Sequence, residues 1–201
     1  MRTYLQWLLV LCFCFITLSS GAEDKDAQAA PNTRYRCQLS MEYMHPKDYD
    51  RQIQTYSVNA FFWTKYFRKI LLNIDVGLTL TYAWGNLLFH EDNPLKLITN
   101  TSAAGIGAIV KLQLTVLKVG NFSIDGMVSE GPILYSNRFP YGGSIYNFMF
   151  RAGPDFKYRI DNRYTMVLGY RFLHVSNAQK TEHRNPSYEA RGFNIGFVRY
   201  L

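Results

Sequence analysis

Cysteine is scarce in this chain, and the motifs that hold metals or phosphates are missing from it. Only three cysteines are present, and two of them, Cys12 and Cys14, lie in the first 22 residues. If that segment is removed, Cys37 is alone, which excludes an internal disulfide and a cysteine metal cluster. The sequence also contains no glycine-rich phosphate loop, no zinc motif and no carboxylate pair at metal spacing, so it predicts no metal or cofactor.

Long apolar runs are missing after the first 22 residues, and the early run has the pattern of a secretory signal peptide. Arg2 supplies the positive charge, residues 8–18 are apolar, and Ser20, Gly21 and Ala22 form a small-residue cleavage site. The run is short for a membrane-spanning helix, which disfavours a transmembrane anchor. We therefore expect a signal peptide at residues 1–22, a polar leader at residues 23–33, and an exported domain at residues 34–201.

Apolar and polar residues alternate with period 2 in eight segments, which is the pattern of β-strands. The clearest case runs from Ile70 to Trp84. The eight predicted strands cover residues 35–43, 54–66, 70–84, 104–116, 122–130, 146–158, 164–176 and 189–201. Pro154 lies inside one of them and cannot donate to a strand ladder, so we expect a bulge or a break there. Short turns (67–69, 118–121, 159–163) alternate with longer loops (45–53, 85–103, 131–145, 177–188), as in transmembrane barrels.

Two kinds of eight-stranded barrel fit this alternation, a soluble one with an apolar interior and a membrane one with an apolar exterior. The apolar sets are long, carry Tyr and Trp toward their ends, and face polar sets of mixed charge, which favours the membrane barrel. The net charge of +7 suits nucleic acid or an anionic membrane surface, and the export signal favours the surface. We predict an all-β, eight-stranded antiparallel transmembrane β-barrel of the outer membrane. Leu78 and Phe148 should face lipid, whereas Asp75 and Arg151 should face the lumen.

Three residues of the kind found in nucleophilic hydrolases fall near the last long loop. His174 and Ser176 share the parity of the apolar residues of their strand, and Glu189 shares that of the next strand. All three should therefore point out of the barrel at its extracellular end. In a Ser-His-acid arrangement, Ser176 attacks a carbonyl, His174 takes the proton, and Glu189 orients the imidazole. Ionisable groups that face a membrane indicate a functional site, whereas the same groups just above the membrane edge, in headgroups or water, would have no role.

The run GYRFLHVSNA at residues 169–178, followed by Asn185, Pro186 and Glu189, resembles the lipid A 3-O-deacylase family of outer membranes. The family's His-x-Ser-Asn, Asn-Pro and Glu pattern is matched by His174, Ser176, Asn177, Asn185, Pro186 and Glu189. Strand order and size are similar over the mature chain, but only the last two strands carry specific motifs. The resemblance implies an integral barrel that hydrolyses an ester-linked acyl chain of lipid A in lipopolysaccharide, without a metal.

Further residues near this loop are candidates for binding the substrate. Asn177 and Asn185 are candidate oxyanion donors, by side chain or backbone N–H. Lys180, His183, Arg184 and Arg191 could hold lipid phosphates or could be solvated loop charges. Glu182 and His183 compete with Glu189 and His174 as acid and base, although a loop is a poorer platform than a strand.

Two other function classes remain open from the sequence. A non-catalytic structural or adhesive barrel would use its long loops to bind a partner. A pore is disfavoured, because eight strands leave no open lumen. The sequence does not indicate which acyl position is cut, which chain length is preferred, or the oligomeric state.

Overall fold

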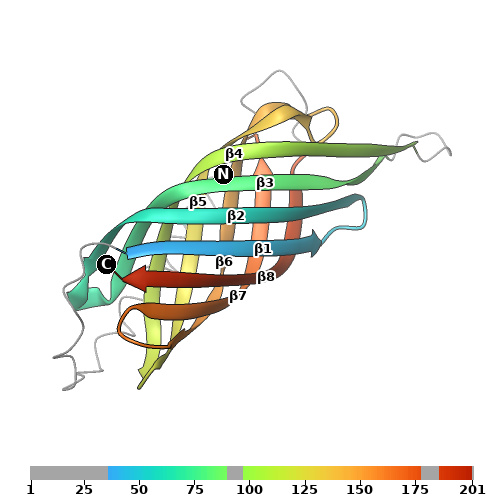
Figure 1. The fold of residues 1–201 in the computed structure, drawn as a ribbon. Coiled ribbons are helices and arrows are strands. Elements are labelled where there is room, and N and C mark those ends of the chain that lie inside the picture. Colours follow the sequence, from blue (N-terminus) through green and yellow to red (C-terminus); the bar gives the residue numbers. More distant parts are fainter. Residues whose placement is uncertain (1–35, 90–96, 178–185, 201) are drawn as a thin grey trace.

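The structure, a computed structural model, describes residues 36–89, 97–177 and 186–200. Its strands are β1 (Arg36–Pro46), β2 (Arg51–Phe67), β3 (Leu72–Phe89), β4 (Leu97–Val119), β5 (Phe122–Phe139), β6 (Ser144–Arg159), β7 (Tyr164–Ser176) and β8 (Tyr188–Tyr200), with a short 3-10 turn, η3 (Arg68–Ile70). The strands pair in chain order, and β8 closes on β1 to form an antiparallel barrel (Figure 1). This confirms the predicted fold. The expected signal peptide and leader lie outside the described residues.

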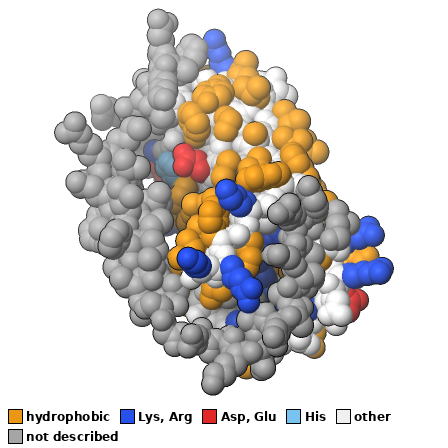
Figure 2. All heavy atoms as spheres, turned by 90° about the vertical axis from the view of Figure 1, so that its left-hand side faces the viewer, with side chains coloured by type: hydrophobic (Ala, Val, Ile, Leu, Met, Phe, Trp, Pro, Cys, Tyr) orange, Lys and Arg blue, Asp and Glu red, His pale blue; other side chains and the backbone are white. Residues whose placement is uncertain are grey.

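The outer face of the barrel is apolar. Leu78 is 45% exposed, and Leu80, Ile106, Phe193 and Phe197 are exposed in the same way. Figure 2 shows hydrophobic side chains spread over the barrel wall, with Lys and Arg side chains between them and toward its edges. Phe148 has the parity of this outer face, as predicted. In the part of the chain that the structure describes, no helix is long and apolar enough to cross a membrane.

One half of the barrel interior is filled by paired charges, which we call the ion-pair network. Asp75 and Arg151 are each 1% exposed, as predicted for lumen residues. Asp75 accepts from Arg36 Nη2 at 2.8 Å and lies 3.1 Å from Lys111 Nζ. The other pairs are Arg151–Glu42, Lys157–Asp125, Arg171–Asp155 and Arg171–Glu42. Opposite charges pair here because an unpaired buried charge is costly.

The other half of the interior is filled by an apolar cluster. Its members are Met44, Ile53, Ala83, Leu87, Ala103, Ile133, Tyr135, Phe139, Met149, Leu173, Val175, Tyr188 and Ala190. Two tyrosines of the cluster form a hydrogen bond, since the hydroxyls of Tyr135 and Tyr188 lie 3.0 Å apart. The cluster lies toward the end where β1 and β7 finish and β8 begins, which is the end that carries the predicted catalytic residues.

Most strands extend beyond their predicted ends, and β3, β4 and β5 extend far enough to correct the predicted loops. β4 has 23 residues and β5 has 18, so most of the predicted loops at 85–103 and 131–145 is strand. β3 likewise continues to Phe89, where it pairs with Leu97. The prediction followed apolar alternation, which ends where a strand leaves the apolar layer. Ladder hydrogen bonds are backbone bonds and continue without an apolar face.

Irregularities in the strands also differ from the prediction. The register shifts between Phe61 and Trp63 in β2 and between Thr115 and Leu117 in β4. Each shift adds a residue to one strand and reverses the facing beyond it, so apolar side chains occupy adjacent positions from Phe61 to Trp63. No register shift occurs at Pro154, but residues 153 and 154 have no partner in β7. The expected break in the ladder is therefore present there without a bulge.

Candidate active site

β7 and β8 bring His174 and Glu189 together on the outside of the barrel. The two residues are direct cross-strand partners in the antiparallel ladder. Their neighbours Leu173 and Val175 in β7 and Tyr188 and Ala190 in β8 are buried in the apolar cluster. Because strand side chains alternate, His174 and Glu189 point outward, as the sequence predicted.

The geometry of this pair suits an imidazole held by a carboxylate. His174 Nδ1 lies 3.4 Å from Glu189 Oε1, and the side chains are 37% and 27% exposed. With Nδ1 directed at the carboxylate, Nε2 is the nitrogen left to exchange a proton with a hydroxyl. This is the arrangement of base and orienting acid in a hydrolytic triad.

Ser176 lies two residues beyond His174 on the same face of β7, and it is partly exposed. Side chains two apart on a strand are separated by roughly 6.5 Å along it. Across the ladder Ser176 faces Phe148 in β6. The Ser176 hydroxyl makes no hydrogen bond to His174 or to any other residue in the described ranges, so no hydrogen bond joins these two candidate residues.

Lys47 is a residue of this site that the sequence reasoning missed. It follows β1 directly, and its ammonium donates to Glu189 Oε2 at 2.5 Å. Its backbone N–H donates to the Glu189 carbonyl at 3.0 Å, and its ammonium lies 5.2 Å from the centre of the Phe172 ring. The hydrogen bond and the charge of Glu189 raise the pKa of Lys47, so this lysine is charged across the neutral pH range.

Lys47 and Glu189 are 142 positions apart in the sequence, so no local motif connects them. The signal that could have revealed the contact is the closure of the barrel. In a closed antiparallel barrel the last strand pairs with the first, so the end of β1 lies beside the start of β8.

The other predicted substrate-binding residues have different outcomes. Arg191 is exposed on the outer face of β8, opposite Phe172 in β7 and His45 in β1. Asn177 is buried, at 1% exposure, with the inward parity of Val175. Five residues that we named lie outside the described ranges, and they are Lys180, Glu182, His183, Arg184 and Asn185. Within those ranges, no group of three or more His, Cys, Asp or Glu side chains is placed to hold a metal ion.

The comparisons with known proteins concern the fold. No protein-family model matches the sequence, and no curated protein sequence matches it. The solved outer membrane enzyme PagL is similar in structure, with a TM-score of 0.50 and 13% identity over 82% of this chain and 99% of that chain. Outer membrane protein AlkL, determined in lipid bilayers, has a TM-score of 0.37 and 13% identity over 90% of this chain and 97% of that chain. The likeness to PagL shows a shared fold, the eight-stranded barrel of outer membrane proteins.

Proposed function

We propose that this protein is a carboxylic ester hydrolase of the outer membrane that removes an ester-linked acyl chain from lipid A. The observation that carries the proposal is the outward His174–Glu189 contact of 3.4 Å, with Ser176 beside it on the same face of β7. The motif that resembles the lipid A 3-O-deacylase family falls on these residues. The barrel fold, shared with an outer membrane enzyme, agrees with the proposal.

The three side chains have separate roles in the proposed reaction. Ser176 Oγ attacks the acyl carbonyl carbon while His174 Nε2 takes the hydroxyl proton. The C–O bond to the lipid alcohol then breaks, and His174 returns the proton to the leaving oxygen. Water, deprotonated by the same imidazole, hydrolyses the acyl-serine and releases the fatty acid. Glu189 stabilises the imidazolium and fixes its tautomer throughout.

The outward position of the site explains why its substrate would be a membrane lipid. Behind His174 and Ser176 the interior is filled by the apolar cluster, so a substrate must arrive along the outer wall. Tyr170, Phe172 and Phe193 cover that wall beside the site, and the rings of Tyr170 and Phe193 lie 5.5 Å apart. An acyl chain can lie against these rings while its ester reaches Ser176.

Charges next to the triad suit an anionic headgroup. Arg191 lies two residues along β8 from Glu189, and Lys47 lies on the other side of that carboxylate. Arg191 can bind a phosphate through its planar guanidinium, whereas Lys47 offers a point charge. Lys180 and Arg184 are further candidates. Because the Asn177 side chain is buried, its backbone N–H is the better oxyanion donor, and Asn185 is the second candidate.

The test is an assay of the protein purified in detergent micelles with lipid A, followed by mass spectrometry of the product. We expect loss of one acyl chain, and we expect Ser176→Ala to abolish it while leaving the barrel folded. The matched control is Ser102→Ala, which removes an exposed serine from β4 outside the site. Release of the acyl chain by Ser176→Ala, or no release by the wild-type protein, would contradict the proposal and favour a non-catalytic barrel.

A further inference from the structure

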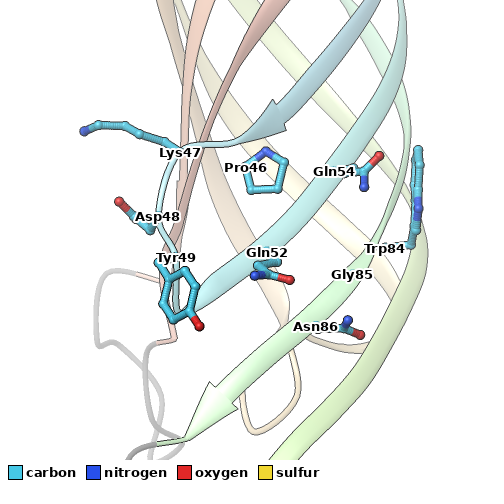
Figure 3. Close-up of a pocket in the computed structure, with 9 residues that line it drawn as sticks. All are labelled: Pro46, Lys47, Asp48, Tyr49, Gln52, Gln54, Trp84, Gly85 and Asn86. Carbon is cyan, nitrogen blue, oxygen red and sulfur yellow. The ribbon is translucent and has the colours of Figure 1, made fainter.

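A second feature of the outer surface lies on the far side of Lys47 from the triad. It is a pocket of about 570 Å³, formed by the loop after β1 and by the neighbouring parts of β2 and β3. Its lining consists of Pro46, Lys47, Asp48, Tyr49, Gln52, Gln54, Trp84, Gly85 and Asn86. Figure 3 shows Gln54 pointing toward Trp84, while the Lys47 side chain is directed away from both. The volume is within the usual range for small-molecule sites.

The pocket presents three amide side chains that are available to a ligand. The carbonyl oxygen of Gln54 accepts from the Tyr43 hydroxyl at 3.0 Å, which leaves the amide nitrogen as a donor. Gln52 and Asn86 make no side-chain hydrogen bond to another residue of the described ranges, and they face each other as partners in β2 and β3. An amide offers both donors and acceptors, so these groups match a ligand with several hydroxyls.

The aromatic side of the pocket is held in place by stacking. The Trp84 ring stacks on Tyr56 at 5.2 Å and on Tyr82 at 5.5 Å, and Tyr56 stacks on Tyr43 at 4.7 Å. A fixed flat ring beside hydrogen-bonding amides matches the two kinds of surface on a sugar ring, whose C–H face is apolar and whose edge carries hydroxyls. A phosphate or an acyl chain would use only part of this lining.

The position of the pocket connects it with the triad. Glu189 in β8 and Gln52 in β2 lie on either side of β1, and Lys47 at the end of β1 touches Glu189 and lines the pocket. Neighbouring strands are about 4.8 Å apart, so Glu189 and Gln52 are separated by roughly 10 Å across the sheet, and Ser176 in β7 lies one strand farther away. One amphiphilic molecule with a sugar headgroup can therefore occupy the pocket and the triad together.

We propose that this pocket binds a sugar ring in the headgroup of the lipid whose acyl ester reaches Ser176. The proposal rests on the proposed function for the identity of that lipid. Gln52, Gln54 and Asn86 hydrogen-bond the hydroxyls, Trp84 supports the ring, and Lys47 stands between the headgroup and the reacting ester. The pocket therefore determines which glycolipid is held with its ester at the nucleophile.

Direct binding of a soluble sugar tests the pocket without any activity. The probe is N,N′-diacetylchitobiose, a neutral disaccharide, titrated against the full chain in detergent micelles and followed by NMR. Gln54→Ala should weaken binding by about 2- to 10-fold, the range expected for one lost hydrogen bond, and Trp84→Ala should weaken it further. The control is Asn137→Ala, which removes an exposed amide from β5 at the end of the barrel that carries the pocket. This change should leave binding unchanged.

Two results would overturn the headgroup site. One is that the disaccharide binds the wild type, Gln54→Ala and Trp84→Ala with the same affinity. The absence of binding to all three proteins counts as this result. The other is inorganic phosphate binding with the same dependence on Gln54 and Trp84, since that would identify an anion site.

Kinetics separate this proposal from the proposed function. Gln54→Ala should raise KM for lipopolysaccharide by a similar factor, while hydrolysis of p-nitrophenyl decanoate, which has no sugar, should stay unchanged. An equal loss on both substrates would contradict a headgroup role. If the wild type hydrolyses neither substrate, the proposed function fails, and the titration still decides whether the pocket binds a sugar.

Discussion

The two halves of the barrel interior are built differently. Around Asp75, Glu42 and Arg151 the lumen is filled by the ion-pair network, in which every charge has an opposite partner. Around Leu173, Val175 and Tyr188 it is filled by the apolar cluster. The change occurs within single strands, since Arg171 belongs to the network and Leu173, two residues on, belongs to the cluster.

This difference suggests what each half does. Buried ion pairs specify one register, because a shift of one residue would turn the charges into the lipid. An apolar cluster packs without needing partners and keeps water away from the strands on which the triad lies. We therefore interpret the network as the part that determines the barrel's register and the cluster as the support behind the proposed catalytic face. The predictions below test this division, from the largest expected effect to the smallest.

The largest effect should come from the outer face, with no effect on either half of the interior. His174→Ala removes the proposed base, so kcat/KM on lipid A should fall about 10⁴-fold or more. Because His174 is 37% exposed and outside the cluster, the free energy of unfolding should change little. Urea unfolding in micelles and the deacylation assay measure the two quantities on the same sample.

Glu189→Ala gives the matched comparison within the triad. It should lose less activity than His174→Ala, because the role we propose for Glu189 is to orient the imidazole and not to react. Equal activity of His174→Ala and the wild type would remove the outer face from the mechanism.

The ion-pair network should show the opposite behaviour. Asp155→Ala removes the buried partner of Arg171 and the acceptor of Gln113 Nε2 at 2.6 Å. Arg171 then keeps only its 3.5 Å contact with Glu42, so the free energy of unfolding should fall by at most about 3–5 kcal/mol. Activity per folded molecule should stay unchanged, because Asp155 pairs with Gly169, roughly 16 Å along β7 from His174. Asp155→Asn keeps a hydrogen-bond acceptor and should cost less, and an equal cost would show that the charge is unimportant.

A pair of valines in β7 compares the two halves most directly. Val175 belongs to the apolar cluster behind the triad, and Val167 is equally buried near the other end of the strand. Val→Ala at either position removes two methyl groups and should cost about 1–3 kcal/mol of unfolding free energy. Only Val175→Ala should also lower kcat, by a few-fold. The cavity that it leaves lies on the inner face of β7, directly behind the outward side chains of His174 and Ser176. A similar fall in kcat for Val167→Ala would show that the cluster is not a special support.

The fold and the central pair of the site could be predicted from the sequence because both follow from the period of two. Parity alone placed Asp75 inside, Leu78 outside, and His174 with Glu189 on the same face. Bulges could not be predicted in this way. The extra residue near Phe61 reverses the facing of its strand, and the run of adjacent aromatic residues there does not indicate which of them is the extra one.

The rest of the site depends on contacts between distant parts of the chain. Lys47 lies in a short polar loop after β1, where a charged residue is ordinary, and only the β1–β8 closure brings it to Glu189. The pocket beside it needs residues from β2 and β3 as well, and no motif connects Gln52, Gln54 and Trp84. Such features need the register of every strand, which alternation alone does not supply.

The smallest expected effect concerns Lys47, and it tests how the charges beside His174 affect the pH dependence of the reaction. Lys47→Met keeps much of the stem that covers Phe172 but removes the charge beside Glu189. The Glu189 carboxylate then interacts with His174 alone, and an unshared negative charge favours a cationic neighbour, so the acid limb of the kcat/KM profile should move to higher pH. Because the Lys47 side chain is 46% exposed and its ion pair lies at the surface, the barrel's stability should change little.

The sign of the pH effect follows from the partners of Lys47. Glu189 raises the pKa of Lys47 above its usual 10.5, so in the wild type the ammonium is charged throughout the range in which an imidazole titrates. Loss of the Lys47 charge should therefore shift the acid limb of the kcat/KM profile. It should not add a second titration near neutral pH. The matched control is Lys118→Met, an exposed lysine at the other end of the barrel, whose profile should equal the wild type. A shift to lower pH in Lys47→Met would mean that Lys47 supports the protonated base, and the proposed charge arrangement would be wrong.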